Sequence, residues 1–331
     1  MNGWREGMRR VNRAPLILAG VWLMTLLFSL PLTLALRDAI ADHLGASLAA
    51  DRAAAGVDYD WMQEFGDVAM GPMVTFKPTI LGFGAVLDNL SAFLDDTTRP
   101  IAIVGFASAY VVLWIFLAGG ILDRYARDRA TRADGFFAAC GVFFFRFVRL
   151  AVVQWIVYAF LFESMHAWLF DRLYHNLIRD LTVERTAFLI RLGLYMLFGL
   201  VLAACNLIFD YAKVRAVVED RRSALGAIVA ALRFINRNAA AAAMLYLLNA
   251  GLFLIVVGVY AVVAPGAGTV GASMWAAFLI SQLYIAARLW VKLVFWGSET
   301  ALFQERLAHA GHVARPEPVW PDSPAADAIN F

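Results

Sequence analysis

Long runs of apolar, uncharged residues alternate with short basic segments along the chain. Two of these runs have 23 residues each, at Ala14–Leu36 and Pro100–Leu122, and Asn238–Ala287 is uncharged for 50 residues. An α-helix rises about 1.5 Å per residue, so about 20 apolar residues cross the hydrocarbon of a bilayer. Pro265–Gly268 is predicted to be a turn that divides the longest run. The pattern therefore predicts six membrane-spanning helices, at residues 14–36, 100–122, 147–168, 186–209, 238–263 and 271–296.

The composition limits the class of protein. Hydrophobic residues make up 62% of the 331 residues and charged residues 16%, with a mean hydropathy of +0.68. Because about 25% of residues in a soluble domain are charged, these values exclude a cytosolic enzyme, a secreted disulfide scaffold and a disordered protein. The first apolar run exceeds the roughly 7–15 residues of a signal-peptide core, so we expect it to be retained. The prediction is an all-α integral membrane protein.

The basic residues are distributed unevenly along the chain. Sixteen of the 28 lie in the N-terminal tail and in the segments after the second and fourth spans, whereas residues 37–99 hold ten acidic residues and four basic ones. Since cytoplasmic loops carry the excess of lysine and arginine, both termini are predicted to be cytoplasmic and residues 37–99 to form a periplasmic insert. The transmembrane domain is expected to cover residues 1–310, and the proline-containing segment 311–331 is expected to be a disordered cytoplasmic tail.

The segments that follow the second and fourth spans resemble each other. Ile121-Leu122-Asp123 recurs as Ile208-Phe209-Asp210 after 87 residues, and Arg146-Phe147 recurs as Arg233-Phe234 at the same offset. With one inserted residue, Arg149 aligns with Arg237 and Tyr158 with Tyr246. Such self-similarity predicts three parallel repeats. Each repeat would be a basic amphipathic cytoplasmic helix that leads into a hairpin of two spans.

Two of the basic segments have a helical pattern. Leu225, Ile228, Val229 and Leu232 form one apolar stripe, as in a helix that lies on a membrane surface. Phe136–Arg149 is apolar nearly all round and is expected to continue directly into the third span. In the insert, Asp38–Ala55 favours a helix, and residues 80–94 form a second amphipathic stripe.

The stretch Phe209–Asp220, which leads through an alanine-rich helix to Arg233-Phe234, resembles bacterial six-helix inner-membrane proteins without known activity. It is also similar to the membrane domain of some glycerophosphodiester phosphodiesterases. The resemblance covers mainly residues 120–250, and the catalytic domain of those enzymes is absent. It implies a fold and a place in the bacterial inner membrane, but no catalytic residue.

Charged residues at the membrane boundary have two interpretations. They bind anionic lipid headgroups, or they form ion pairs that dock one repeat against the next. The candidates are Arg146, Arg149, Arg233, Arg237, Asp123 and Asp210.

Polar residues inside the spans also have two interpretations. They join helices by hydrogen bonds, or they line a path through the membrane. The candidates for such a path are Tyr158, Asn206, Tyr246, Gln282 and Arg288. Tyr284, Arg288 and Lys292 share one face of the sixth span, where the two cations are expected to extend to the headgroups.

The sequence contains no motif that specifies a reaction or a cofactor. Glu163 and His166 form one pair with ligand spacing, and Asp171 and His175 form another. The two pairs point to different sides of a helix, so no metal site is expected. Cys140 and Cys205 are expected to be small membrane-buried side chains. No nucleic-acid partner is expected, because the basic clusters lie at membrane boundaries.

Three functions remain open. The first is a non-enzymatic multi-pass inner-membrane protein that binds anionic lipid or scaffolds a partner, which would be a membrane protein or a second copy of the chain. The second is a transporter or channel for a small or amphipathic substrate. The third is a membrane-embedded enzyme acting at the periplasmic face, around Glu163, His166 and His175.

Overall fold

The computed structural model describes residues 2–45, 47–80, 82–98, 100–266 and 271–307. Helices make up 87% of the structure, and the described residues contain no strand. This result confirms the predicted all-α class. The predicted tail at 311–331 lies outside the described residues, and so do residues 267 and 268 of the predicted turn at Pro265–Gly268.

Six helices are long and apolar enough to cross a membrane, so the chain is a multi-pass membrane protein. They include all six predicted spans, but several continue beyond them. The fourth, for example, ends at Val218 rather than at 209, because the added segment contains alanine, lysine and arginine, which are good helix formers, and a charge does not stop a helix. The spans are α2 (Pro15–Leu44), α6 (Ile101–Arg127), α7 (Ala133–Phe160) with its continuation, α9 (Glu184–Val218), α11 (Ala239–Val263) and α12 (Ala272–Arg306).

The third span is a single rod with an irregular far half. α7 continues without interruption through η3 (Leu161–His166) and η4 (Trp168–Tyr174) into α8 (His175–Ile178). Both η segments are π-helical, a conformation that periodicity in the sequence does not reveal. The predicted continuation of Phe136–Arg149 into this span is confirmed, because α7 contains the whole segment.

Shorter helices occupy the remaining chain. α1 (Asn2–Asn12) precedes the first span, and α10 (Ala224–Arg237) precedes the fifth. The insert is not one long helix at 38–55, because α2 runs on to Leu44 and a separate helix follows. Its elements are α3 (Ala50–Ala55), α4 (Tyr59–Val68), η1 (Gly71–Thr75), η2 (Pro78–Ile80) and α5 (Gly82–Leu94).

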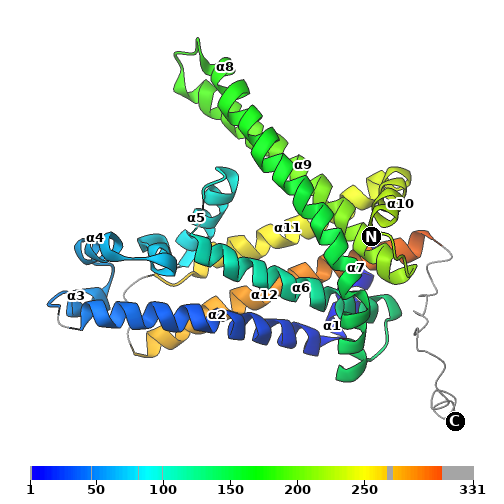
Figure 1. Cartoon of the computed structure of the whole chain (residues 1–331), viewed down its shortest axis with the longest axis horizontal. Helices are drawn as coiled ribbons and strands as arrows, with labels where there is room; N and C mark the ends of the chain where they lie inside the picture. The colour runs from blue at the N-terminus through cyan, green and yellow to red at the C-terminus, as the bar shows by residue number, and fades with distance from the viewer. Residues whose placement is uncertain (1, 46, 81, 99, 267–270, 308–331) are drawn as a thin grey trace.

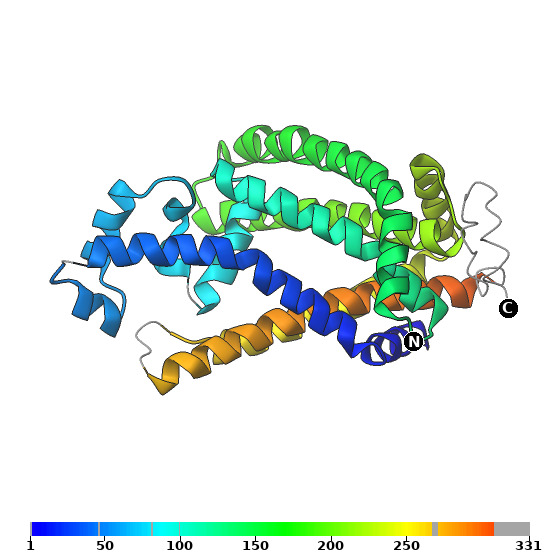
Figure 2. The same ribbon diagram turned by 60° about the horizontal axis from the view of Figure 1, so that its bottom comes forward.

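The largest buried core lies at one end of the molecule, and two smaller clusters lie in the third and fourth spans and in the insert. We call the end with the largest core the hub; it comprises α1, α10, the first half of α7 and the C-terminal ends of α6, α9 and α12. Side chains such as Tyr125, Phe143, Tyr211 and Phe303 are completely or almost completely buried there. Away from the hub the spans diverge, and α7–α8 with α9 form an arm that leaves the other helices (Figures 1 and 2).

The diverging spans expose apolar side chains. Leu27, Leu200 and Leu254 are 53%, 67% and 66% exposed. Lipid chains are as apolar as leucine, so helices in a bilayer need not bury such residues against each other. We therefore interpret the diverging parts as the lipid-facing parts of the molecule and the hub as the part that fixes their positions.

Three helix pairs build the hub in the same way. α1 packs on the end of α12, α7 on the end of α6, and α10 on the end of α9. Small residues allow the close approach. A Cβ on Gly7 would collide with the backbone of Ser298, and a Cβ on Gly120 would lie 2.6 Å from Cys140 Sγ. In the third pair the contact face of α10 consists of Ala227, Ala230, Ala231 and Phe234.

The insert contacts the arm around the end of α5, where one carboxylate joins the two parts in addition to the contacts of Phe93 and Leu94 with Phe162 and His166. Asp95, just after α5, accepts hydrogen bonds from the Tyr195 hydroxyl and, at 3.2 Å, from Arg191 of α9. The hydrogen bond from Tyr195 is the main cause that lowers the pKa of Asp95 below its ordinary value, with Ser91 and Arg191 acting in the same direction. α5 itself is a helix as predicted, but none of its residues is buried.

Candidate functional site

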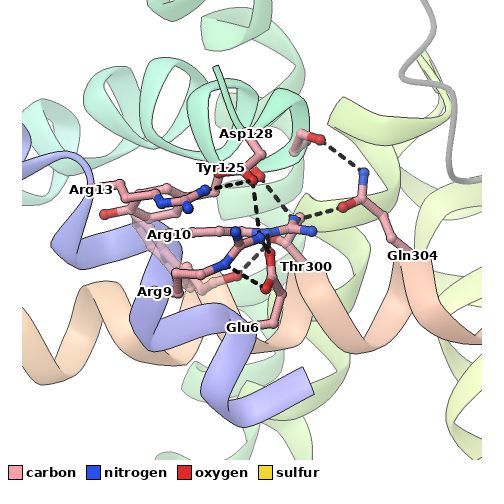
Figure 3. Close-up of polar contacts among 10 residues, drawn as sticks. Glu6, Arg9, Arg10, Arg13, Tyr125, Asp128, Thr300 and Gln304 are labelled. Carbon is pink, nitrogen blue, oxygen red and sulfur yellow. Dashed lines mark hydrogen bonds and ion pairs between the residues drawn. The ribbon is translucent and has the colours of Figure 1, made fainter. Parts of the chain in front are cut away.

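Ion pairs connect α1 to the end of α6, and a hydrogen bond connects α1 to α12 (Figure 3). Arg9 and Arg13 approach Asp128 at 3.3 and 3.7 Å, and Asp128 ends α6 in the left-handed conformation with a φ of 44°. Glu6 accepts hydrogen bonds from Arg9 and, at 3.0 Å, from Arg10. The hydrogen bond from Arg9 is the main cause that lowers the pKa of Glu6.

Arg10 continues the network into the groove between α1 and α12. Its guanidinium donates to the Tyr125 carbonyl at 2.9 Å and to Gln304 Oε1 at 2.6 Å. The Gln304 amide donates in turn to the Ala126 carbonyl at 2.9 Å. An open pocket of about 560 Å³ lies beside these residues, lined by α1 and α12. Of its three arginines, Arg9 and Arg10 are engaged in the contacts of α1 and Arg5 is exposed, so we interpret the pocket mainly as part of the docking of α1.

A similar ion pair lies at the end of α9. Asp220 also adopts a left-handed conformation, with a φ of 51°, and pairs with Arg146 of α7. Glu219, beside it, pairs with Arg215 at 2.6 Å and with Arg221. In the first place, an aspartate after the second span pairs with arginines that precede the first span. In the other, an aspartate after the fourth span pairs with an arginine from the segment that leads into the third span.

The two aspartates expected to dock the repeats have other partners. Asp123 pairs with Arg127 at 2.8 Å, one turn further along the same helix. Asp210 accepts from Lys213 Nζ at 2.8 Å, from the Asn206 amide at 2.9 Å and from Trp296 Nε1 at 3.4 Å. The spacings of three and four residues place these partners on one helix face, which satisfies the carboxylates locally before any arginine of another helix can reach them.

Three of the four predicted docking arginines therefore remain without a carboxylate. Arg149, Arg233 and Arg237 are exposed, and in the part of the chain that the structure describes none of them pairs with an acidic residue. Arg149 donates only to the Phe145 carbonyl at 3.2 Å. The fourth, Arg146, is the partner of Asp220.

α10 presents an apolar row beside these arginines. Leu225, Val229 and Leu232 are 65%, 46% and 37% exposed, while Ala231 and Phe234 on the opposite side are buried against α9. The predicted stripe thus exists on a helix, and it faces outward because the alanine face makes the closer contact with α9.

The predicted polar path is assembled only in part. Tyr158 of α7, Asn206 and Asp210 of α9, and Tyr246 of α11 lie close together, on the side of the hub from which the spans diverge. Gln282 lies elsewhere and accepts from Trp22 Nε1 at 3.1 Å, between α12 and α2.

The sequence predicts no site role for Lys213, whereas it predicts that Lys292 extends to the headgroups and that Glu299 pairs with an arginine. Lys292 is exposed, and its ammonium lies 3.4 Å from the centre of the Trp114 ring. Glu299 is 1% exposed, and neither of its carboxylate oxygens has a hydrogen-bond partner among the described residues. The recurrence of an acid near the end of each even-numbered span was the available signal for Glu299. Its lack of a partner is decided by packing.

A buried side-chain amide fixes α1 to the neighbouring helices. Asn249 of α11 is completely buried, accepts from Trp4 Nε1 at 3.0 Å and donates to Ser298 Oγ at 2.8 Å. This amide thus joins α1, α11 and α12, as expected for polar groups in membrane proteins.

The histidines considered as metal ligands, His166 and His175, do not converge on one site. His166 Nε2 donates to the Leu94 carbonyl at 2.8 Å, and His175 Nδ1 lies 3.2 Å from the Phe170 carbonyl. Within residues 2–307, apart from the undescribed positions, no group of three or more histidine, cysteine, aspartate or glutamate side chains could hold a metal ion. Cys140 is buried and Cys205 partly buried, and both are free thiols.

Comparison of the chain with protein-family models, with curated proteins and with solved structures finds no match.

Proposed function

We propose that the protein binds anionic membrane lipid at the basic surface of the hub, and that this surface faces the cytoplasm. The observation that carries the proposal is a set of exposed hub arginines without an acidic partner among the described residues, while six carboxylates of the hub pair with other basic residues. Asp123, Asp128, Asp210, Asp220, Glu6 and Glu219 all have basic partners. Arg149, Arg233 and Arg237 have none among the acidic residues described.

The position of these arginines suits lipid headgroups. Arg233 and Arg237 lie on α10 next to the exposed row of Leu225, Val229 and Leu232. A helix with an exposed apolar row and flanking cations binds the interface of an anionic membrane. Each basic residue near such a surface contributes on the order of 1 kcal/mol.

Joint replacement of Arg149, Arg233 and Arg237 by glutamine is expected to weaken phosphatidylglycerol binding about a hundredfold, because three contributions of this size are lost. The number of phosphatidylglycerol molecules retained by the purified protein, measured by native mass spectrometry at low and high salt, checks this expectation. Wild-type binding should decline as salt rises.

Arg37, Arg179 and Arg185 provide a matched control. They are also exposed, but they lie away from the hub, in α2, after α8 and in α9. Their joint replacement by glutamine changes the charge equally and should leave retention at low salt almost unchanged. Equal losses in the two variants would show that overall charge, and not the hub, governs binding, and the proposal would be rejected.

We also propose that the chain consists of three parallel repeats, with both termini in the cytoplasm of a bacterial inner membrane. The three equivalent helix pairs of the hub and the equivalent positions of Asp128 and Asp220 support the repeat. In this arrangement α1 of the first unit packs on α12 of the third, so the units form a closed ring.

The orientation has its own test. A cysteine introduced at Ser47 should react with a membrane-impermeant thiol reagent in cells whose outer membrane has been permeabilised, and one at Ser323 should react only after cell lysis. The unmodified chain is the control, since Cys140 is buried and Cys205 is partly buried. Labelling of position 323 before lysis would reverse the proposed orientation.

A further inference from the structure

α12 carries two cations outside the set of exposed hub arginines. Arg288 and Lys292 are four residues apart and lie on one helix face, about 6 Å from each other along the axis. Both are exposed, although the residues next to Lys292 in the sequence, Val291 and Leu293, are only 2% and 0% exposed. Neither cation pairs with a carboxylate within the described residues.

Two aromatic rings lie near the ammonium of Lys292. The Trp114 ring of α6 lies 3.4 Å from Nζ, and the Trp296 ring lies 5.6 Å away. Aromatic faces attract a cation but leave its charge without an anionic partner. The nearest candidate, Asp210, is already engaged by Lys213 and Trp296. Lys292 therefore has no anionic partner among the described residues and can bind an anion.

Arg288 is a second cation one helical turn away, on the side of the apolar part of the span. Its guanidinium lies 5.6 Å from the centre of the Tyr284 ring, which stacks on Tyr260 of α11 with 3.8 Å between the ring centres. The stacked tyrosines hold α11 against α12 beside the two cations. Further along the same helix face, at 14 and 18 residues from Lys292, Phe278 and Met274 are 46% and 49% exposed.

This face combines two neighbouring cations at the hub with exposed apolar side chains below them. We propose that Lys292 and Arg288 bind the phosphate of an anionic phospholipid, whose acyl chains lie along α12 over Phe278 and Met274. The inference rests on the proposed function in taking an anionic lipid as the ligand, but it uses none of the same residues. It assigns one specific lipid to α12, in addition to those attracted by the hub surface.

The chemistry also predicts selectivity. An anionic phospholipid supplies the negative charge that both cations lack, and its chains cover the apolar part of the face. A zwitterionic phospholipid supplies the chains without the net charge. Inorganic phosphate supplies the charge without the chains, so it should compete weakly at equal concentration.

Native mass spectrometry of the full chain in detergent tests this assignment. Titration with phosphatidylglycerol gives the affinity of the first, tightest lipid, and we expect Lys292→Gln to weaken it about fivefold and Lys292→Gln with Arg288→Gln about 25-fold. Lys292→Arg keeps the charge and should retain the lipid, which separates a lost site from a lost fold. Lys77→Gln removes an exposed lysine outside the hub and is the matched control.

The outcomes separate this proposal from the previous one. Weaker first-lipid binding in Lys292→Gln, with normal first-lipid binding in the triple arginine variant, supports the α12 site whatever happens to the hub surface. Unchanged affinity in the double variant rejects the site. Equal affinity for phosphatidylcholine, or displacement of the lipid by an equal concentration of inorganic phosphate, also rejects it, because the site would then not recognise an anionic lipid.

Discussion

Replacement of Gly7 by valine is expected to detach α1 from the hub and to lower the stability of the protein by about 3 kcal/mol or more. The Cβ of any residue at position 7 would collide with the backbone of Ser298. Overpacking of a core usually costs about 1–3 kcal/mol when side chains can move, and here the obstacle is the main chain of α12. Gly297 makes the same contact in reverse, since its Cβ would lie 3.0 Å from the Gly7 carbonyl oxygen.

Detachment would also break polar contacts that depend on α1. The Trp4–Asn249 hydrogen bond and the bond from Arg10 to the Tyr125 carbonyl require α1 to lie against α11, α12 and α6. Loss of the first leaves a buried amide unsatisfied, which costs about 1–3 kcal/mol. The melting temperature in detergent, together with protease sensitivity of residues 1–14, measures the effect.

Gly20→Val is the control for this substitution. Gly20 lies in α2, and no heavy atom would approach its Cβ within 4 Å. This variant should melt close to the wild type and keep α1 protected from protease. Equal stability of the Gly7 and Gly20 variants would show that α1 does not pack on α12 as described.

Asp210→Ala is expected to destabilise the protein by about 3–5 kcal/mol, the cost of removing one partner from a buried charged pair. Its carboxylate receives hydrogen bonds from Lys213, Asn206 and Trp296, so the substitution leaves three donors without their acceptor. The melting temperature and the urea midpoint of the detergent-solubilised protein measure the loss.

Glu299→Gln provides the contrast within the same core. Glu299 is as deeply buried as Asp210, but its carboxylate oxygens accept no hydrogen bond from the described residues. An isosteric amide removes an acidic group that has no partner, so we expect a change of less than about 1 kcal/mol or a gain in stability. A severe loss in Glu299→Gln, similar to that in Asp210→Ala, would contradict the assignment of Asp210 as the paired carboxylate.

Most of the secondary structure could be predicted from the sequence. Hydrophobic runs gave the six spans because a helix satisfies its own backbone hydrogen bonds in a bilayer, so that apolar length alone specifies it. The apolar stripe from Leu225 to Leu232 identified the helix α10 in the same way. The π-helical segments η3 and η4 were missed, since a local shift to wider hydrogen bonding leaves no clear period in the sequence.

The candidate site was predicted less completely. The sequence identified Arg146, Arg149, Arg233 and Arg237 as a basic group, but not that only Arg146 has a carboxylate partner, Asp220. The i+4 spacing of Asp123 and Arg127 was visible and favours an intrahelical pair. A partner one turn away on the same helix needs no tertiary contact, so it competes with any arginine of another segment.

By itself the sequence determined the all-α membrane class, the six spans and the concentration of arginine at their ends, because length, hydrophobicity and charge act locally along the chain. Only the tertiary structure decided that Gly7 meets Ser298, that Asn249 joins Trp4 to α12, and that Lys292 faces Trp114 with no anion. Each of these contacts joins residues far apart in the sequence. Their existence depends on the angle and closeness at which whole helices pack, and no local pattern of residues encodes that.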